Sequence, residues 1–189
     1  MGIISKESDR LIGLVEEILD FSKLQQNEMK LSIVLMDIKV VLQETILNIW
    51  AKAEKKRIHL VLECEDTIYI KGDPNRLKQV FLNLVDNAVK FSPEDSSIVL
   101  SAHRLSASEM AVIGISEAHL SRVRDRFFQV DALNGGTGLG LAISQQIVEL
   151  HNGKLEMDSE LGKGTQVTVI LPLTEERPPA PALPENVYE

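Results

Sequence analysis

The sequence is poor in cysteine, in aromatic residues and in basic side chains. Its one cysteine, Cys64, excludes an internal disulfide and a cysteine-built metal site, and fits a reducing, cytoplasmic setting. Twenty basic against 28 acidic side chains give a formal net charge of −8, which argues against binding to nucleic acid or to an anionic membrane. No apolar run reaches the roughly 18 residues that a membrane-spanning helix needs, and no signal-peptide pattern opens the chain. We therefore expect a soluble fragment, and the sequence leaves open whether a parent protein is anchored in a membrane.

The first 30 residues predict a separate helical arm. Apolar residues recur there at heptad spacing, in one row at Ile4, Leu11 and Ile18 and in a second row at Leu14 and Phe21. A helix with such an apolar stripe needs a partner in water, so we expect it to pack in a bundle or to form a homodimer. Folding back against its own chain is the alternative.

Patterns typical of strands and of helices alternate along the rest of the chain. Strands are predicted at 30–38, 57–64, 67–72, 98–102, 154–160 and 165–173, an apolar run stands at 110–115, and helices are predicted at 38–56, 74–90, 116–128 and, after a glycine-rich stretch, up to residue 150. Asp37 and Asp73 stand where they can cap two of these helices, and Pro74 suits a first helical turn. The alternation indicates an α/β layer fold, whereas residues 175–189, rich in proline and glutamate, predict a disordered tail.

A row of polar side chains is predicted on the helix at 74–90. Steps of three and four residues place Asn83, Asn87 and Lys90 on one face, away from the apolar face. Amide oxygens suit a hard cation such as Mg²⁺, and a lysine at the end of the row can neutralise a phosphate. A solvated polar face is the alternative explanation of the row.

Glycines are concentrated in the stretch "NGGTGLGLAISQQIVELHNG", which spans residues 134–153. Gly135, Gly136, Gly138 and Gly140 allow positive φ angles and a close approach of a ligand to the backbone. The helix that follows offers N–H groups and a positive dipole end to an anion, and a phosphate is the obvious candidate. A turn that only reverses the chain is the alternative.

Taken in order, the stretches "NLVDNAVKFS", "RFFQV", "GGTGLGLAIS" and "IVELHNGKLEMDSELGKGTQVTVILP" resemble the ATP-binding domain of sensor histidine kinases. The wider group includes gyrase-type, chaperone and mismatch-repair ATPases. The resemblance covers about 33–173, and the first helix resembles the second helix of the kinase dimerisation and phosphoacceptor domain. It implies a partial dimerisation helix at 1–30, an ATP-binding domain at 31–174 built as a two-layer sandwich of a mixed sheet covered by helices, and a tail at 175–189.

The resemblance also implies roles for individual residues. Asn87 would be the principal Mg²⁺ ligand and Asn83 its helper, and Asn83 and Lys90 would be the catalytic pair at the phosphates of ATP. The residues implied in nucleotide binding are Asn87, Lys90, Phe91, Gly114, Phe128, Gly136, Thr137, Gly138, Leu139 and Gly140.

The reaction implied is transfer of the γ-phosphoryl group of ATP to a histidine of a dimerisation domain, and then to an aspartate of a response regulator. Hydrolytic members of the group have a glutamate at the position of Asn83, and an amide is no general base, so the resemblance favours transfer over hydrolysis.

The sequence departs from the family pattern in three places. No phosphoacceptor histidine precedes the catalytic region, and the histidines present, at 59, 103, 119 and 151, are expected to be structural. Gly114 and Ile115 look like the end of an Asp-x-Gly-x-Gly turn, but Met110 stands where its adenine-binding aspartate would align. The lid over the nucleotide has only the six residues 129–134. Either stretches are missing from the sequence as given, or they were removed deliberately, or the protein is a degenerate, non-catalytic kinase module that acts as a dimerising regulatory binding protein.

Overall fold

The structure, a computed structural model, describes residues 2–26, 28–64, 67–106, 109–116, 139–160 and 164–178. The described elements are, in chain order, α1 (Gly2–Gln25), β1 (Val34–Asp37), α2 (Ile38–Lys55), β2 (His59–Cys64), β3 (Tyr69–Gly72), α3 (Pro74–Phe91), β4 (Ser97–Arg104), β5 (Glu109–Ser116), α4 (Gly140–Leu150), β6 (Lys154–Glu160) and β7 (Gly164–Pro172). Of the predicted helix at 116–128, Ser116 is the last residue of β5, and the rest, with the lid at 129–134 and the end of the tail, lies outside the described residues.

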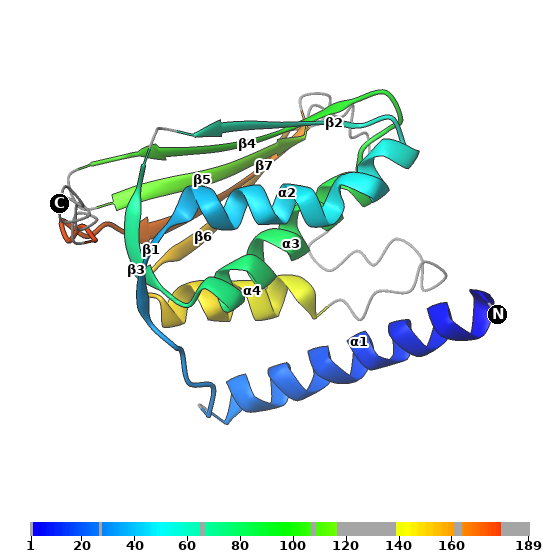
Figure 1. The fold of residues 1–189 in the computed structure, drawn as a ribbon, viewed down its shortest axis with the longest axis horizontal. Helices are drawn as coiled ribbons and strands as arrows, with labels where there is room; N and C mark the ends of the chain where they lie inside the picture. The colour runs from blue at the N-terminus through cyan, green and yellow to red at the C-terminus, as the bar shows by residue number, and fades with distance from the viewer. Residues whose placement is uncertain are drawn as a thin grey trace, which may run out of the picture.

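Two sheets organise the described residues. The larger has five strands in the order β2-β4-β5-β7-β6, in which β2 runs parallel to β4 and the other neighbours are antiparallel. A smaller antiparallel pair, β1 with β3, stands at one end. Helices α2, α3 and α4 lie together along one face of the larger sheet (Figure 1). The expected mixed sheet covered by helices is thereby confirmed.

The two predicted helix caps are present. The Asp37 side chain accepts a hydrogen bond from the N–H of Lys39 at the start of α2. At the start of α3, the Asp73 side chain accepts from the N–H groups of Asn75 and Arg76, and Pro74 occupies the first turn. These carboxylates satisfy N–H groups that have no partner within the helix, so both helices begin where local sequence places them.

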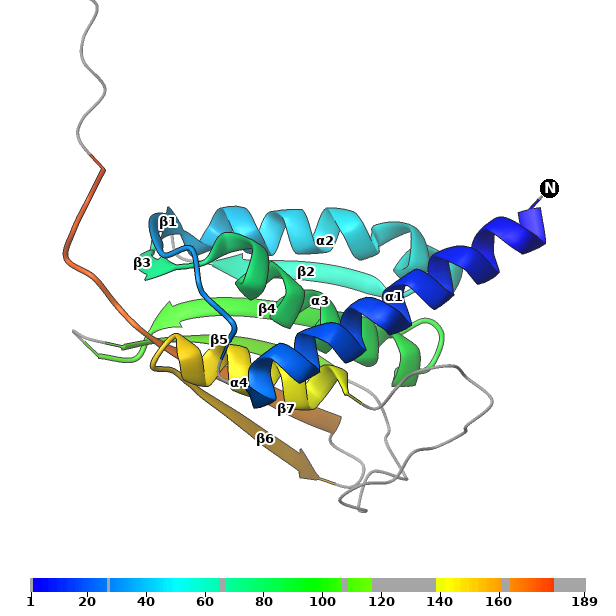
Figure 2. The same cartoon turned by 90° about the horizontal axis from the view of Figure 1, so that it is seen from below.

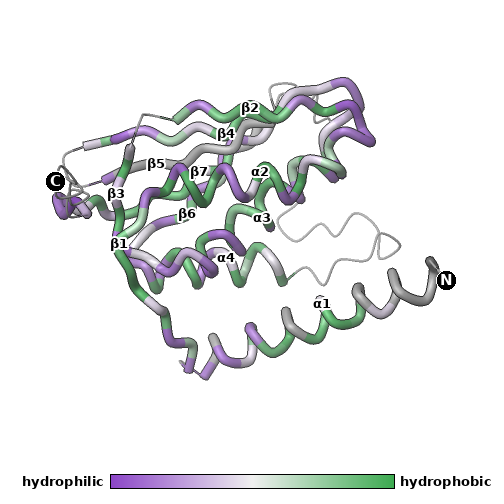
Figure 3. The backbone as a smooth tube through the Cα atoms, in the orientation of Figure 1, coloured by the Kyte–Doolittle hydropathy of each residue, from purple (hydrophilic) through white to green (hydrophobic). Residues whose placement is uncertain are grey.

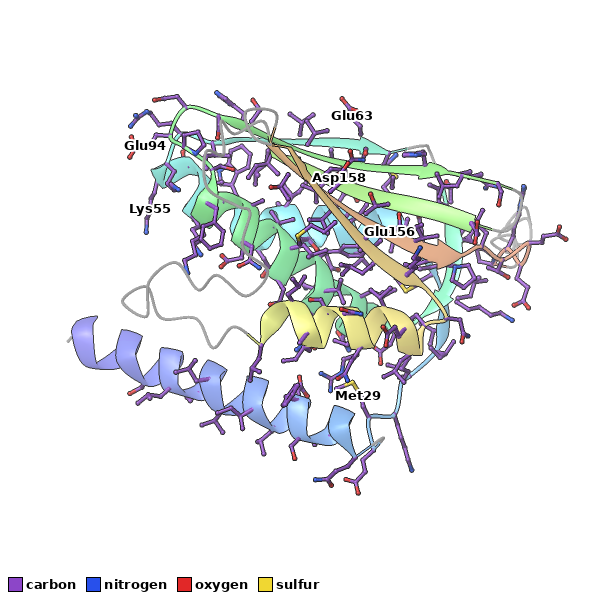
Figure 4. All side chains as sticks on the ribbon, turned by 180° about the vertical axis from the view of Figure 1, so that it is seen from behind. Met29, Lys55, Glu63, Glu94, Glu156 and Asp158 are labelled. Carbon is purple, nitrogen blue, oxygen red and sulfur yellow. The ribbon has the colours of Figure 1, made fainter. Side chains whose placement is uncertain are left out.

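The core lies between the helices and the larger sheet, where the side chains of both layers meet (Figure 4). Its fully buried members include Ile38, Leu42, Leu77, Val80, Ile98, Leu100, Ile143 and Ile147. On α3, Val89 is fully buried, whereas Leu84 and Ala88 are only partly buried.

Helix α1 lies outside the two layers, below α3 and α4 in Figure 1 and in front of α4 in Figure 2, which is seen from below. Its middle is hydrophobic (Figure 3), and the side chains of Leu11, Ile12, Val15, Ile18 and Leu19 are between 53% and 58% exposed. Its last turns fold back on the chain, since Phe21 packs against the core. This contact agrees with the alternative that the helix folds back against its own chain, and the homodimer stays a prediction.

A polar cluster fixes the same end of α1 to α3. One Arg76 guanidinium nitrogen donates to an Asp20 carboxylate oxygen at 2.7 Å, and the Gln79 amide donates to the same oxygen at 2.9 Å. Burial raises the pKa of Asp20, but the hydrogen bonds from Gln79 and Arg76 and the nearby positive charges outweigh this effect, so the pKa is lowered.

No helix within the described ranges has the length and apolar character to cross a bilayer.

Candidate functional site

The polar row of α3 meets the first turn of α4. Helices α3 and α4 pack side by side. The Asn83 amide nitrogen donates to the Gly140 carbonyl oxygen at 3.3 Å and lies 3.4 Å from the Ser144 hydroxyl oxygen. Asn83 is partly buried by these contacts, whereas Asn87, one turn further on, is exposed. Two stretches that the sequence separates by more than 50 residues thus form one surface.

The contacts of Asn83 orient its amide. Because the nitrogen faces Gly140 and Ser144, the oxygen is the end of the group left for another partner. An amide oxygen is a suitable ligand for a hard cation, so the arrangement fits the Mg²⁺ that the resemblance implies. Ser144 is fully buried, and no pattern in the sequence points to it, because its role depends on how α4 packs against α3.

The C-terminal end of the row combines a cation with an aromatic ring. The Lys90 ammonium lies 5.2 Å from the centroid of the Phe91 ring, within the range of a cation–π contact. Phe91 is 44% exposed, and α3 ends after it at Ser92, which is buried. An exposed ring beside an ammonium suits a ligand that has both a flat apolar part and an anionic part.

The first turn of α4 forms the other side of the surface. The helix begins at Gly140, and its N-cap, Leu139, makes no side-chain capping hydrogen bond. The first N–H groups of a helix have no intrahelical partners, and its positive dipole end favours an anion. Gly140 has no left-handed φ, and an added Cβ would lie no closer than 3.5 Å to Asn83. Neither a positive φ nor a close contact with the described residues therefore requires glycine at this position.

Two of the predicted nucleotide-binding residues have other surroundings in the structure. Gly114 lies inside β5, paired with Leu100 on one side and Val167 on the other, so the expectation that it closes a turn is wrong. The Leu139 side chain packs against the hydrophobic core. The remaining members of the set, Phe128, Gly136, Thr137 and Gly138, lie outside the described residues.

Met110, expected in place of an adenine-binding aspartate, also lies in β5, paired with Arg104 and Leu171. The strand pairing continues through the place where the family turn would begin.

His151 fixes the relative position of α3 and α4 at their far end. Its Nε2 accepts a hydrogen bond from the Asp73 N–H at 2.9 Å, and its Nδ1 donates to the Ile147 carbonyl at 2.7 Å. The ring is buried, and burial lowers its pKa against the smaller opposing effects of Ile147 and of the Asp73 charge. The ring is thus a structural link between the start of α3 and the end of α4, as expected for this histidine.

A pocket of about 510 Å³ lies elsewhere, at the opposite end of α4 from Gly140. Its lining includes Met29, which lies beneath α4 (Figure 4), together with Lys71, Asn152 and Leu173. None of the polar row contributes to it. The surface formed by Asn83, Asn87, Lys90 and Gly140 is the better candidate site, because it combines cation ligands, a positive charge and a helix N-terminus.

Residues 72–175 match the family of histidine kinase-, DNA gyrase B-, and HSP90-like ATPases. The match spans more than half of the chain, and it includes α3, α4 and the strands between and after them. The chain therefore belongs to this family.

Within the family, the chain is most informatively compared with sensor histidine kinases. It is 34% identical, over 97% of its length, to the sensor histidine kinase GacS of Pseudomonas protegens, and it covers 22% of that protein. It is 31% identical, over 92% of its length, to the sensor histidine kinase YclK of Bacillus subtilis, and it covers 38% of that protein. The crystal structure of full-length ShkA in complex with AMPPNP is similar with a TM-score of 0.78 at 27% identity, over 94% of this chain and 39% of that one. The resemblance to the ATP-binding catalytic domain of sensor histidine kinases is confirmed, and the chain spans between a fifth and two fifths of the length of these proteins.

Proposed function

We propose that this chain is the ATP-binding catalytic core of a two-component sensor histidine kinase, which transfers the γ-phosphoryl group of ATP to a histidine on a dimerisation domain. The observation on which this rests is the contact of Asn83 with Gly140 and Ser144, which joins the polar row of α3 to the N-terminus of α4. The similarity to ShkA, whose structure contains the ATP analogue AMPPNP, supports a nucleotide at this surface.

Each side chain of the surface has a role in this proposal. Asn87 and Asn83 hold Mg²⁺, which when bound neutralises charge on the phosphates. Lys90 binds phosphate oxygens, Phe91 lies against the adenine, and the first N–H groups of α4 bind a phosphate. Gly114, Phe128, Gly136, Thr137 and Gly138 stay in the nucleotide site as predictions from the resemblance.

The chemistry proposed is transfer and not hydrolysis. The Asn83 amide nitrogen faces α4, and an amide has no basic lone pair with which to activate water. In-line transfer needs the acceptor and the nucleotide to be held in position, and it needs no general base of this kind. We therefore expect slow turnover of ATP without an acceptor protein.

The acceptor and the partners of the reaction lie beyond this domain. We propose that residues 1–30 are part of a dimerisation domain, because the middle of α1 exposes five large apolar side chains. A homodimer through α1 would bury them, and the acceptor histidine would come from a helix that pairs with it. A response regulator is the proposed final acceptor.

The test is phosphotransfer from ATP labelled on its γ-phosphate to a supplied dimerisation domain that has its histidine. We expect label on that domain and its loss, by about a hundredfold, in Asn87→Ala, because the metal ligand is removed. Asn48→Ala is the matched control, since Asn48 is an exposed amide on α2 whose nitrogen donates to the Glu44 carbonyl oxygen. Phosphotransfer at the wild-type level in Asn87→Ala would contradict the assignment.

A second candidate function is a non-catalytic kinase module that regulates a partner by dimerising. Its basis is that Met110 stands where the family has an adenine-binding aspartate and that the lid is short in the sequence, although the sensor-kinase relatives do not favour it. Titration with ATP and Mg²⁺ separates the two proposals. Dimers that form through α1 without any nucleotide binding would support the regulatory module.

A further inference from the structure

The side chain of Lys56 joins the end of α2 to the end of α3. Lys56 is the C-cap residue of α2, and its ammonium donates to the carbonyl oxygens of Val89 at 2.9 Å, Lys90 at 3.0 Å and Ser92 at 2.8 Å. An ammonium has three N–H donors, and here each has an acceptor. The acceptors all belong to the last turn of α3 and the residue that caps it.

This contact satisfies carbonyl groups at the C-terminus of α3, which in every helix lack partners within the helix. The last carbonyls of a helix lack intrahelical partners, and the negative end of the helix dipole lies beside them. A lysine that donates to these carbonyls satisfies both requirements. The acceptor carbonyl of Ser92 belongs to a residue that is only 3% exposed, so water is a poor substitute for the ammonium there.

The turn that Lys56 holds is the one that presents Lys90 and Phe91. The Lys90 carbonyl is itself an acceptor, and Phe91 lies between Lys90 and Ser92. The Lys90 ammonium and the Phe91 ring, 5.2 Å apart, extend from this segment of backbone. Movement of the turn would displace both the phosphate contact and the adenine contact of the proposed site.

A second set of contacts ties the loop after α3 to the same place. The Asp95 N–H donates to the Lys56 carbonyl at 3.2 Å. The Arg57 guanidinium donates to Glu94 at 2.7 Å and to Asp95 at 2.6 and 2.8 Å. These ion pairs are exposed to solvent and contribute little to stability. They do not contact the turn at Lys90, so Arg57 offers a matched control next to Lys56 in the sequence.

We infer that Lys56 is a positioning residue for nucleotide binding: its ammonium holds the last turn of α3 and thereby sets the places of Lys90 and Phe91. The inference rests on the proposed nucleotide site. Helix α2 contributes no residue to the nucleotide site, and through its C-cap Lys56 it would support that site.

The test compares the Kd of ATP, with Mg²⁺ in excess, among the wild type, Lys56→Met and Arg57→Gln, by displacement of a fluorescent ATP derivative. Met keeps the length of the side chain but removes the three donors. We expect the Kd to rise about tenfold or more in Lys56→Met, because a shift of about 1 Å in binding groups has large effects on their interactions with a ligand. In Arg57→Gln we expect a change of no more than about twofold, since exposed ion pairs are weak.

Hydrogen exchange without nucleotide supplies an independent measurement. The amides of residues 90–92 should exchange faster in Lys56→Met than in Arg57→Gln. Should Lys56→Met fail to fold, Lys56→Arg takes its place, because a planar guanidinium cannot direct its N–H groups to three carbonyls that surround one nitrogen. For that variant we expect a smaller rise in Kd, of about threefold or more.

The outcomes separate the inference from the function on which it rests. A wild type that binds no ATP would overturn the nucleotide site and the role of Lys56 together. Wild-type binding with an unchanged Kd in Lys56→Met, or an equal loss in Lys56→Met and Arg57→Gln, would overturn the role of Lys56 and leave the nucleotide site standing.

Discussion

Replacing Gly153 by alanine should strongly destabilise the fold, because the added methyl group would lie too close to β7. Gly153 follows α4, and its N–H donates to the Val148 carbonyl at 2.9 Å. An added Cβ would lie 2.4 Å from the Ile170 carbonyl oxygen in β7 and 2.8 Å from a Leu171 methyl carbon. The first contact is with backbone, which cannot rotate away, so α4 and β7 have to separate.

The magnitude follows from these contacts. Forcing extra atoms into a packed core costs about 1 to 3 kcal/mol, and occasionally more. Because Ile170 is paired with Lys154 and Ala111 on either side, its displacement disturbs three strands, and we expect a cost of about 3 kcal/mol. With a urea slope of about 2 kcal/mol per M, the unfolding midpoint should fall by about 1.5 M.

The assay is urea unfolding followed by far-UV circular dichroism, with Gly140→Ala as the control. The Cβ added at Gly140 meets nothing closer than 3.5 Å, an ordinary contact distance. Since alanine favours helix over glycine by up to about 1 kcal/mol, this variant should be as stable as the wild type or slightly more stable. A Gly153→Ala midpoint within error of the wild type would refute the reasoning from close approach.

Two further predictions concern single polar groups. Folding lowers the pKa of His151 below its ordinary value of 6.5. As the pH falls below 6.5, the unfolded chain therefore binds a proton at His151 that the folded chain does not bind. The free energy of unfolding should then decrease, by at most about 1.4 kcal/mol per pH unit. Urea midpoints between pH 7.5 and 5 test this, and an equal slope in His151→Gln would count against it. Asp20→Asn removes the charge that Arg76 contacts, and should weaken docking of α1 by about 1 to 2 kcal/mol. Amide exchange should then quicken in α1 and not in α3, and uniform exchange would contradict the prediction.

The sequence by itself determined the features that depend on near neighbours. The caps at Asp37 and Asp73 act on N–H groups two or three residues away, and the spacing of Asn83, Asn87 and Lys90 fixes their common side of α3. The strands and helices among the described residues follow from apolar periodicity. Such features need only the geometry of one element, which residue spacing specifies.

The tertiary structure alone decided what the elements do to one another. It placed Ser144 and Gly140 against Asn83, the Lys56 ammonium against the end of α3, and Phe21 against the core. It also placed Gly114 within a paired strand and not in a turn. These contacts depend on how far each helix is rotated and where it crosses its neighbour. Many side chains distant in sequence set those quantities together, and no local pattern of residues contains them.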